Sequence, residues 1–510
     1  MNAPLEGKSL IWATLALSMA TFMQVLDSSI ANVAIPTISG SLGASTTQGT
    51  WVITSFGVAN AISLPLTGWF AKRFGEVKLF LWSTVLFTLF SWLCGISSSL
   101  EMLIFFRVMQ GLVSGPMIPL SQSLLLANYP PAKRAIALSL WSMTVIVAPI
   151  CGPVLGGYIS DNYHWAWIFF INVPVGIFVV LLTARVLEGR ETQKEYKPMD
   201  TIGLGLMVLG VGSLQIMLDQ GRELGWFNSN EIVVLAVLAV VSLAFFIVWE
   251  LTDDNPVIDL SLFGYRNFSI AVICTSLGYM IYFGVIVLLP LLMQTNLGYT
   301  ASWAGWASAP VGLIPLLLSP IIGRYAHKID MRILVSISFL VYAGCFLWRA
   351  TLFSPQISFE WIVWPQFVQG IAVACFFMPL TTITLSGLPP SQLANASSLS
   401  NFMRTLAGSI GTSITTTLWD NGEAVNQTYL TEHVNPYNPA AQQALDSMHQ
   451  LGMNSQQAAG MIAQQITQQS YILSANTIFT ICGVMFLGLL VLIWFAKPPF
   501  NAAGGNSGAH

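Results

Sequence analysis

Long apolar segments separated by short polar ones recur along almost the whole chain. They run for roughly 18 to 27 residues, and a helix that crosses the hydrocarbon core of a bilayer needs about 20. The pattern therefore predicts fourteen transmembrane helices, near residues 10–36, 50–70, 79–99, 101–126, 135–158, 166–187, 201–218, 231–250, 268–290, 300–322, 333–352, 361–386, 396–418 and 470–496.

The composition supports this interpretation and excludes several classes of protein. Of the 510 residues, 55% are hydrophobic and only 8% are charged, whereas soluble domains carry about 25% charged residues. The mean hydropathy is +0.69. A net charge of −3 offers no basic face for nucleic acid. We therefore expect an all-α polytopic membrane protein whose immediate surroundings are a lipid bilayer.

The first apolar segment does not have the pattern of a cleavable signal. Lys8 precedes an apolar run at 10–35, which is longer than the 7–15 residues of a secretory signal core. The run also contains Asp27 and Asn32. We expect it to be the first membrane helix, retained in the mature protein.

The basic residues gather on one side of the predicted spans. Of the 19 Lys and Arg residues, only Arg222 and Arg349 lie in segments on the opposite side, and Arg107 lies inside a span. Short cytoplasmic loops carry the excess of Lys and Arg in membrane proteins. We therefore expect a multi-pass protein with both termini in the cytoplasm and the long polar segment 419–469 on the outer face.

The segment 419–469 is polar and Gln-rich, but it carries helix signals. Asn438 and Pro439 are typical of an N-cap followed by proline in the first helical turn. Asn454 or Ser455 is suited to cap a second helix with one apolar face, made of Ala458, Met461, Ile462 and Ile466. Two interpretations remain open, namely a small helical lid that packs on itself and a docking surface for an external partner.

An internal repeat indicates how the spans are organised. The pattern Arg-x-x-Gln-Gly at 107–111 recurs as Gln-x-x-Gln-Gly at 366–370, and Tyr-Pro-Pro at 129–131 recurs as Leu-Pro-Pro at 388–390, with the same spacing of 259 residues. Six spans with short loops take up roughly 190 residues at about 20 to 25 per span. The repeat spacing of 259 residues is longer than this, and the difference equals the length of two helices. Repeated halves with a site between them are the plan of many secondary transporters.

We therefore predict two six-helix halves plus two inserted central helices. The expected boundaries are 1–200 for the N-terminal half, 201–250 for the inserted transmembrane helices and 251–510 for the C-terminal half, which includes the outer segment 419–469. Such repeats are related by an axis along the membrane normal.

Two further motifs are present, one directly after the second span and one within the fifth span. The segment 68–78 after the second span reads Gly-Trp-Phe-Ala-Lys-Arg-Phe-Gly-Glu-Val-Lys. The fifth span carries closely spaced glycines and prolines, namely Pro149, Gly152, Pro153, Gly156 and Gly157. Glycine and proline in a membrane helix permit close backbone approach and a kink.

These motifs, with the segment 26–36 of the first span and 107–111 of the fourth, resemble the fourteen-span drug:proton antiporter branch of the major facilitator superfamily. The segment 148–157 is similar to the antiporter motif of that branch. Gly68, Arg73, Gly75 and Lys78 are similar to the conformational loop motif of the family. The sequence departs from the family pattern at Lys72, where an acidic residue is usual, and at Ala148, where glycine is usual.

The resemblance implies the major facilitator fold and a secondary active transporter that is not an enzyme. It implies proton-driven export of lipophilic drugs and toxic compounds across the bacterial inner membrane by alternating access, with antibiotic resistance as a consequence. The implied partners are a periplasmic adaptor of the EmrA type and an outer-membrane channel of the TolC type. The alternatives are a proton-coupled permease of the same superfamily that works inward, and a membrane subunit that does not transport.

Two residues of opposite charge lie inside the predicted spans at similar depth. Asp27 lies about 17 residues, or about 25 Å, from the inner end of the first span. Arg107 lies roughly 9 Å from the outer end of the fourth span, so both residues lie in the outer half of the bilayer. Ionisable residues inside a bilayer are costly and are functional candidates by default. We expect Asp27 to carry the coupled proton with Arg107 as its charge partner. The alternative is a permanent pair that only fixes helix packing.

The substrate pathway is predicted from polar and aromatic residues inside spans. The expected cavity residues are Gln24, Gln110, Gln122, Gln366, Gln369, Phe376, Phe377 and Met378. The alternative for each is ordinary helix packing.

The other ionisable residues near the spans have simpler interpretations. Glu250, Arg349 and Arg404 are expected to snorkel from span ends. The acids Asp219, Glu223 and Glu231 are expected to lie in a solvated outer loop.

The sequence contains no phosphate-binding loop, no HExxH and no GxSxG motif. The six cysteines lie inside apolar runs and form no CxxC pair. We therefore expect no metal site and no cofactor, with the proton gradient as the energy source.

Overall fold

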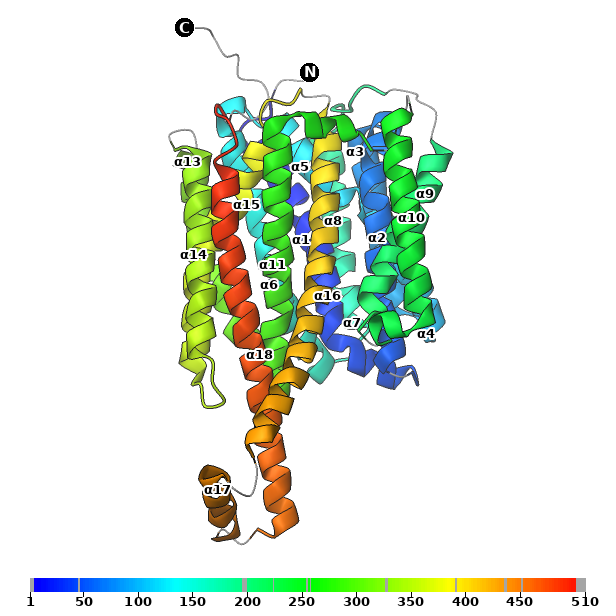
Figure 1. Cartoon of the computed structure of the whole chain (residues 1–510). Coiled ribbons are helices and arrows are strands. Elements are labelled where there is room, and N and C mark those ends of the chain that lie inside the picture. Colours follow the sequence, from blue (N-terminus) through cyan, green and yellow to red (C-terminus); the bar gives the residue numbers. More distant parts are fainter. Residues whose placement is uncertain are drawn as a thin grey trace.

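The computed structural model describes residues 4–44, 46–194, 200–222, 224–253, 256, 258–325, 329–389, 392–434, 438–450 and 453–500. Over these ranges the chain forms long helices that run side by side (Figure 1). The helices of the first part are α1 (Gly7–Ser41), α2 (Thr46–Phe74), α3 (Glu76–Gly95), α4 (Leu100–Ser114), α5 (Met117–Asn128), α6 (Arg134–Asn162), α7 (Trp167–Phe170) and α8 (Asn172–Val186).

The later helices are α9 (Thr201–Gln220), α10 (Asn230–Thr252), α11 (Arg266–Thr295), α12 (Ala301–Ser308), α13 (Leu313–Tyr325), α14 (Met331–Leu352), α15 (Phe359–Thr384), α16 (Leu393–His433), α17 (Pro439–Gln450) and α18 (Ser455–Ile493). Short 3-10 helices connect some of them, namely η1 (Pro131–Lys133), η2 (Trp226–Asn228), η3 (Leu260–Gly264) and η4 (Ala309–Gly312).

Thirteen segments among the described residues are helical, long and apolar enough to cross a membrane. They correspond to all the predicted spans except 396–418, which lies in α16. That helix is more polar because Ser, Thr, Asn and Gly recur along it. Seven of its polar side chains between 396 and 418 are buried, namely Ser397, Ser398, Asn401, Arg404, Ser413, Thr415 and Thr416, and α11 and α18 pack against the helix.

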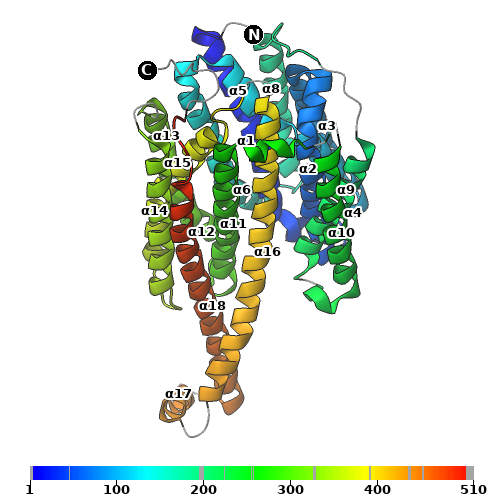
Figure 2. The same cartoon turned by 45° about the horizontal axis from the view of Figure 1, so that its top comes forward.

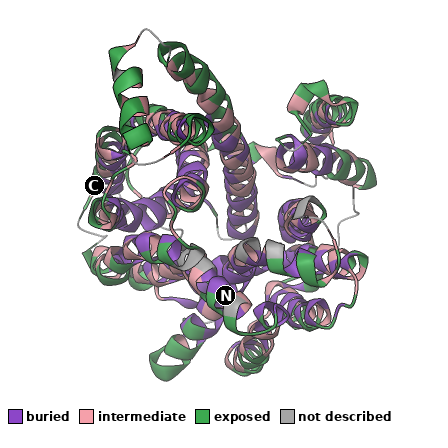
Figure 3. Ribbon diagram, turned by 90° about the horizontal axis from the view of Figure 1, so that it is seen from below, coloured by how far each residue is buried: buried purple, intermediate pink, exposed green. Residues whose placement is uncertain are grey.

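The outer surface of the bundle is apolar where the helices face away from one another. Figure 3 shows buried residues toward the interior and exposed residues around the rim. On α10 the exposed apolar side chains include Val234, Val237, Val240, Phe245, Val248 and Leu251. A helix of 23 residues is about 35 Å long, enough to cross a hydrocarbon core of about 30 Å. This surface is suited to contact lipid.

The helices pack in two groups with an extra pair at the edge. In the first group α1 contacts α6, α8 and α2, while α2 contacts α4. In the second, α11 contacts α16, and α14 contacts α15 and α18. Helices α9 and α10 pack on each other, and α9 also contacts α2 and α16 (Figure 1).

The two groups meet closely near the end of the bundle where α1 begins and α18 ends. Ser397 Oγ donates to Gln122 Oε1, and Ser398 Oγ donates to the carbonyl of Leu64. Ser139 Oγ donates to the carbonyl of Ser319. These bonds join α5, α2 and α6 of the first group to α16 and α13 of the second, so the interface is closed at this end.

The structure corrects the predicted end of one span at 418 and the predicted start of the next at 470, because both helices extend into the segment 419–469. Helices α16 and α18 have 41 and 39 residues, about 60 Å each at 1.5 Å per residue. Both therefore continue beyond the bundle as a helical hairpin, with α17 at its tip (Figure 2). The segment 419–433 continues α16 because it contains no proline and is rich in residues that tolerate a helix.

Specific contacts hold the two arms of this hairpin together. The Trp419 and Tyr471 rings lie 4.8 Å apart, and Trp419 Nε1 donates to the Tyr471 carbonyl at 2.9 Å. Farther out, Gln427 Nε2 donates to Thr467 Oγ1 at 3.1 Å. The predicted cap at Asn454 is confirmed, because its side chain accepts from the Gln457 backbone in a capping box. The hairpin is therefore an ordered extension of two membrane helices.

Candidate functional site

The predicted pair of intramembrane charges forms the centre of a buried polar cluster. Arg107 Nη1 of α4 donates to Asp27 Oδ2 of α1 over 2.6 Å. Both side chains are fully buried, with 0% of their surface exposed. The structure thus brings together the two residues that the sequence placed at similar depth.

Asp27 accepts from two further side chains at its second oxygen. Asn172 Nδ2 of α8 donates to Asp27 Oδ1 at 2.7 Å, and Gln110 Nε2 of α4 donates to the same oxygen at 3.3 Å. Three donors compensate a buried carboxylate for the loss of water. The carboxylate consequently joins α1, α4 and α8 at one point.

Arg107 also has partners that do not depend on the charge of Asp27. Its Nε donates to the Val52 carbonyl at 3.0 Å, and its Nη1 donates to Gln110 Oε1 at 2.8 Å. The guanidinium lies 4.1 Å from the centroid of the Phe56 ring, a distance typical of a cation–π contact. Neutralising Asp27 would therefore loosen α1 while Arg107 stays attached to α2 and α4.

Asn172 is a site residue that the sequence analysis missed. It begins α8 and is 1% exposed, and its Nδ2 also donates to Ser91 Oγ at 2.9 Å. The sequence did contain a signal for it, because Asn172 lies about as far from the outer end of the sixth span as Arg107 lies from the outer end of the fourth. Two polar residues at the same depth can meet when their helices are neighbours.

The glycines of the antiporter motif place α6 directly against α1. A Cβ atom at Gly152 would lie 2.0 Å from Ser29 Oγ, and one at Gly156 would lie 2.8 Å from the Ile30 carbonyl oxygen. Ser29 and Ile30 lie within one turn of Asp27. The motif, which comprises Pro149, Gly152, Pro153, Gly156 and Gly157, therefore lies in the part of α6 that packs beside the charged cluster.

The loop motif lies at the closed end of the interface. Gly68 of α2 approaches α16 so closely that a Cβ atom would lie 2.1 Å from Asn395 Oδ1. The Arg73 guanidinium lies 5.5 Å from the Trp69 ring. Gly68 thus adds to the contact between α2 and α16 that the Ser398 bond to the Leu64 carbonyl also makes.

An acidic residue from another segment caps the start of α3. Gly75 has φ +95°, and a Cβ atom there would lie 2.3 Å from the carboxylate of Glu191. The backbone N–H groups of Val77 and Lys78 each donate to this carboxylate at 3.0 Å. Carboxylates are favourable at helix N-termini, where N–H groups lack helical partners. Glu191 thus ties the segment after α8 to the loop motif.

We predict that Glu191→Ala destabilises the protein by about 1–2 kcal/mol, because it removes the acceptor from two N–H groups at a helix start. Thermal unfolding of the purified protein measures the effect. Glu188→Ala is the matched control, since Glu188 is an exposed acid in the same segment. Equal unfolding midpoints for the two variants would contradict the capping role.

Arg349 forms a second buried cluster, and the expectation that it snorkels is wrong. It is 0% exposed although it lies in the last turn of α14. Its Nη2 donates to Gln366 Oε1 at 2.8 Å and to Gln369 Oε1 at 2.5 Å. The Arg349 side chain points into the bundle because these two oxygens of α15 accept its N–H groups. In the internal repeat, Gln366 and Gln369 correspond to Arg107 and Gln110.

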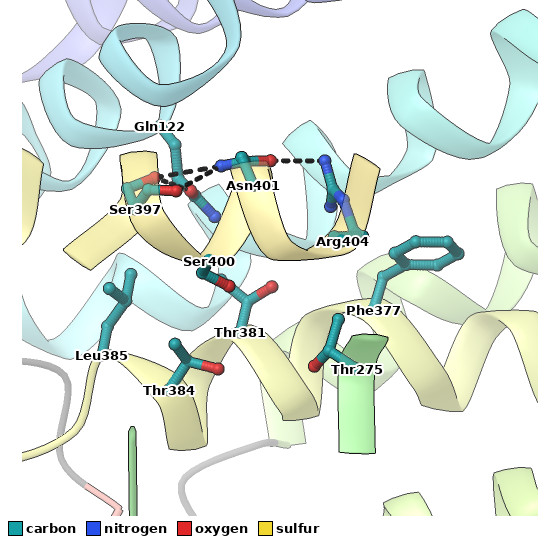
Figure 4. Close-up of a pocket in the computed structure, with 10 residues that line it drawn as sticks. All are labelled: Gln122, Thr275, Phe377, Thr381, Thr384, Leu385, Ser397, Ser400, Asn401 and Arg404. Atoms are coloured by element: carbon teal, nitrogen blue, oxygen red, sulfur yellow. Dashed lines mark hydrogen bonds between the residues drawn. The ribbon is translucent and has the colours of Figure 1, made fainter. Parts of the chain in front are cut away.

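A small pocket lies between the two helix groups, near the closed end. It is lined by side chains of α5, α11, α15 and α16 and by Leu385 at the end of α15 (Figure 4). The lining residues are Gln122, Thr275, Phe377, Thr381, Thr384, Leu385, Ser397, Ser400, Asn401 and Arg404. Arg404 is 8% exposed, so it does not snorkel either. It enters the pocket because it lies eleven residues into α16, well away from the end of that helix.

The predicted cavity residues do not share one pocket. Gln122 and Phe377 line it, whereas the other glutamines near the charges bind Asp27, Arg107 or Arg349, as described above. Gln24 is buried on α1, and its Oε1 has no hydrogen-bond partner among the described residues. Phe376 packs 5.9 Å from the Tyr342 ring, and Met378 is 1% exposed in the core. Sequence position within a span did not reveal which helix face each residue occupies.

Two of the remaining acids also lie elsewhere than expected. Glu250 is 4% exposed and accepts from the Ile258 N–H at 2.9 Å. It therefore binds the backbone of the segment that connects α10 to η3, and it does not snorkel. Asp219 lies within the last turn of α9 and accepts from Gln215 Nε2 at 3.3 Å. Glu231 is exposed in the first turn of α10, and Glu223 lies outside the described residues.

Comparison with known proteins identifies the family to which this geometry belongs. A sequence model of the Major Facilitator Superfamily matches residues 17–412. The chain belongs to the major facilitator superfamily. Members of this superfamily are membrane transporters, so the protein is a transporter and not an enzyme. The predicted all-α polytopic fold is confirmed by the family match and by the helical structure.

Several relatives in this superfamily match over nearly their whole length. The chain is 69% identical over 507 residues to the multidrug export protein EmrB of Escherichia coli, covering 99% of each chain. It is 65% identical to EmrB of Haemophilus influenzae, covering 98% of each. It is 54% identical to the fatty acid resistance protein FarB of Neisseria gonorrhoeae, covering 99% of each. The predicted resemblance to the drug-exporting branch of the superfamily is thus confirmed.

Solved structures support the major facilitator fold. The human organic anion transporter MFSD10 matches with a TM-score of 0.58 at 11% identity, over 96% of this chain and 100% of that one. A bacterial homologue of the lysosomal transporter Spinster, in an inward-facing conformation, matches with a TM-score of 0.55 at 16% identity, over 97% and 100%. At these identities the likeness concerns the fold alone.

Proposed function

We propose that this protein exports lipophilic drugs and toxic compounds across the bacterial inner membrane in exchange for protons, by alternating access. The observation that carries the proposal is the buried Asp27–Arg107 ion pair, which joins α1 to α4 at 2.6 Å. An intramembrane carboxylate with a charge partner is suited to bind and release a proton. The names of the EmrB relatives as multidrug export proteins support the direction of transport.

The proposed cycle begins when Asp27 takes up a proton from the outer side. The neutral carboxyl no longer forms an ion pair with Arg107, so the attachment of α1 to α4 is weakened. Because α6 packs on Ser29 and Ile30 through Gly152 and Gly156, a shift of α1 is transmitted to α6. Helix α6 in turn contacts α13 and α15 of the other group, which provides a route from proton binding to the interface that opens and closes.

The proton gradient is the proposed energy source, with no cofactor. The absence of a phosphate-binding loop in the sequence supports this. Both termini are proposed to be cytoplasmic, because Lys and Arg are enriched in the connections at the end where α1 begins. That arrangement directs the helical hairpin to the periplasm.

Drug accumulation in cells that lack their own efflux pumps tests the proposal. Cells expressing the transporter with its adaptor should hold less of a hydrophobic antibiotic, and dissipating the proton gradient should abolish the difference. Greater accumulation that depends on the gradient would instead support the inward permease. Accumulation equal to that of cells without the transporter would contradict transport of the tested compounds in either direction.

We propose that the hairpin binds a periplasmic adaptor of the EmrA type, which connects the pump to an outer-membrane channel of the TolC type. Its arms project beyond the bundle, and exposed apolar side chains lie on them, namely Val425, Tyr429 and Met461. Exposed apolar residues on a solvated helix favour a protein partner. The alternative is a lid that acts on the transporter itself.

Removing the tip of the hairpin separates these two roles. Residues 429–465 are replaced by a short Gly-Ser linker, which is feasible because the flanking Gln427 and Thr467 side chains are in contact at 3.1 Å. We predict that co-purification of the adaptor falls at least about tenfold, a change of 1.4 kcal/mol, while drug transport by the isolated protein in liposomes persists. Unchanged adaptor binding would contradict the docking role, and loss of transport alone would support the lid.

A further inference from the structure

Arg404 is a buried cation that lacks an acidic partner. It lies on α16 about 16 Å from the first residue of that helix and is 8% exposed. One of its N–H groups donates to Asn401 Oδ1, and its guanidinium lies 4.8 Å from the Tyr279 ring. Within the described parts of the chain it forms no ion pair with a carboxylate. A guanidinium offers five N–H donors, and the bond to Asn401 uses one of them.

The other two buried arginines differ from Arg404 in their surroundings, because neither of them lines this pocket. Arg107 has Asp27 as its counter-ion. Arg349 has no carboxylate partner, but it is 0% exposed and its guanidinium is directed to the two glutamines of α15. Only Arg404 of the three lines the pocket between the helix groups. Its positive charge is therefore accessible to a molecule that enters this space.

The pocket is small in this conformation, and its walls carry the groups that would bind an amphiphile with one negative group when the two helix groups move apart. Thr381 and Ser400 line the same pocket as Arg404 and carry hydroxyls, and Phe377 contributes an aromatic ring to its wall (Figure 4). No Asp or Glu is among the residues that line the pocket. A planar carboxylate matches the fork of N–H groups on arginine, and an aromatic or aliphatic body would pack on the Phe377 ring.

We propose that Arg404 is a specificity-determining residue that binds the carboxylate of anionic amphiphiles in this pocket. The proposal rests on the proposed export function and names the chemical class that this site takes. Gln122 extends into the pocket from α5 of the first helix group, so a bound molecule contacts both groups. A ligand between the two halves is positioned where alternating access requires it.

A matched pair of ligands tests the role of the charge. The ligands are 2-naphthylacetate and 2-naphthylacetamide, which have nearly the same shape but differ by one negative charge. Calorimetry measures their binding to the full-length protein in nanodiscs. We expect the wild type to bind the carboxylate at least tenfold more tightly than the amide. Arg404→Gln should abolish this preference without weakening the amide, and Arg404→Lys should retain part of it.

The control variant is Arg222→Gln, which removes an equivalent charge from an exposed ion pair with Asp420 and should keep the wild-type preference. Preference for the carboxylate in Arg404→Gln would overturn the proposal. Equal weakening of both ligands would also overturn it, since Arg404 would then only maintain the pocket. Absence of binding to the wild type would exclude this pocket as the site.

An export assay in cells distinguishes a failure of this inference from a failure of the proposed function. Cells expressing Arg404→Gln should still export a neutral hydrophobic antibiotic while export of the naphthyl carboxylate falls at least tenfold. Export of both compounds at wild-type rates would overturn the inference and leave the export function intact. Failure of the wild type to export either compound would instead contradict the proposed function.

Discussion

Cells that express Asp27→Asn are expected to accumulate as much drug as cells without the transporter. One proton that crosses about 150 mV supplies roughly 3.4 kcal/mol, which supports a concentration ratio of about 300. Asparagine cannot carry that proton, so the ratio should fall to near one. Drug accumulation at matched membrane levels of protein measures this. Asp420→Asn is the control, because Asp420 forms an exposed ion pair with Arg222, which is worth only about 0–1 kcal/mol.

Asp27→Asn leaves Arg107 buried without its counter-ion, and breaking a buried pair costs about 3–5 kcal/mol. The double variant Asp27→Asn, Arg107→Gln removes both charges and therefore tests whether folding alone explains the loss. We expect the double variant to reach the membrane and purify as a single species, yet to export no drug. Gradient-driven export by either variant would contradict the assignment of the proton to Asp27.

The second large effect is expected at the contact between α11 and α16. A Cβ atom at Gly411 would lie 2.0 Å from the carbonyl oxygen of Met280 and 2.6 Å from its carbonyl carbon. Both atoms belong to the backbone of α11, so the clash cannot be relieved by a change of rotamer. Gly411→Ala should therefore destabilise the protein by about 3 kcal/mol. Thermal unfolding and the yield of monodisperse protein measure this loss.

Gly408→Ala is the matched control because it lies one turn earlier on the same helix. The nearest atom to a Cβ there is 3.7 Å away, in the Phe283 ring, which is an ordinary contact. Alanine also favours the helix by about 1 kcal/mol over glycine. The two substitutions should therefore act in opposite directions. Equal stability of both variants would contradict the close approach of α11 and α16.

Much of this arrangement could be predicted from the sequence because membrane helices obey strong constraints. The spacing of apolar segments gave the spans, since each must cover the thickness of the hydrocarbon core. The depth of Asp27 and Arg107 along their spans predicted a contact that the structure contains at 2.6 Å. Depth could be estimated because a helix rises by a constant 1.5 Å per residue.

The angular position of side chains could not be estimated in the same way. Asn172, Arg349 and Arg404 all lie in or near apolar spans, and only the packing of neighbouring helices determines whether they face lipid, core or pocket. The nearly uniform apolar character of these spans gives little indication of which face is buried. For the same reason the predicted glutamines separated into four different environments. The hairpin was missed because polar helices beyond a membrane lack the apolar signal that marks a span.

The central claim is that drug and proton move in opposite directions and that Asp27 carries the proton. The most direct measurement is the internal pH of liposomes that contain the purified transporter, after external addition of a lipophilic drug without titratable groups. We predict that drug entry drives protons out, so the internal pH rises with the wild type and stays constant with Asp27→Asn. A fall in internal pH with the wild type, or an equal rise with Asp27→Asn, would contradict the account.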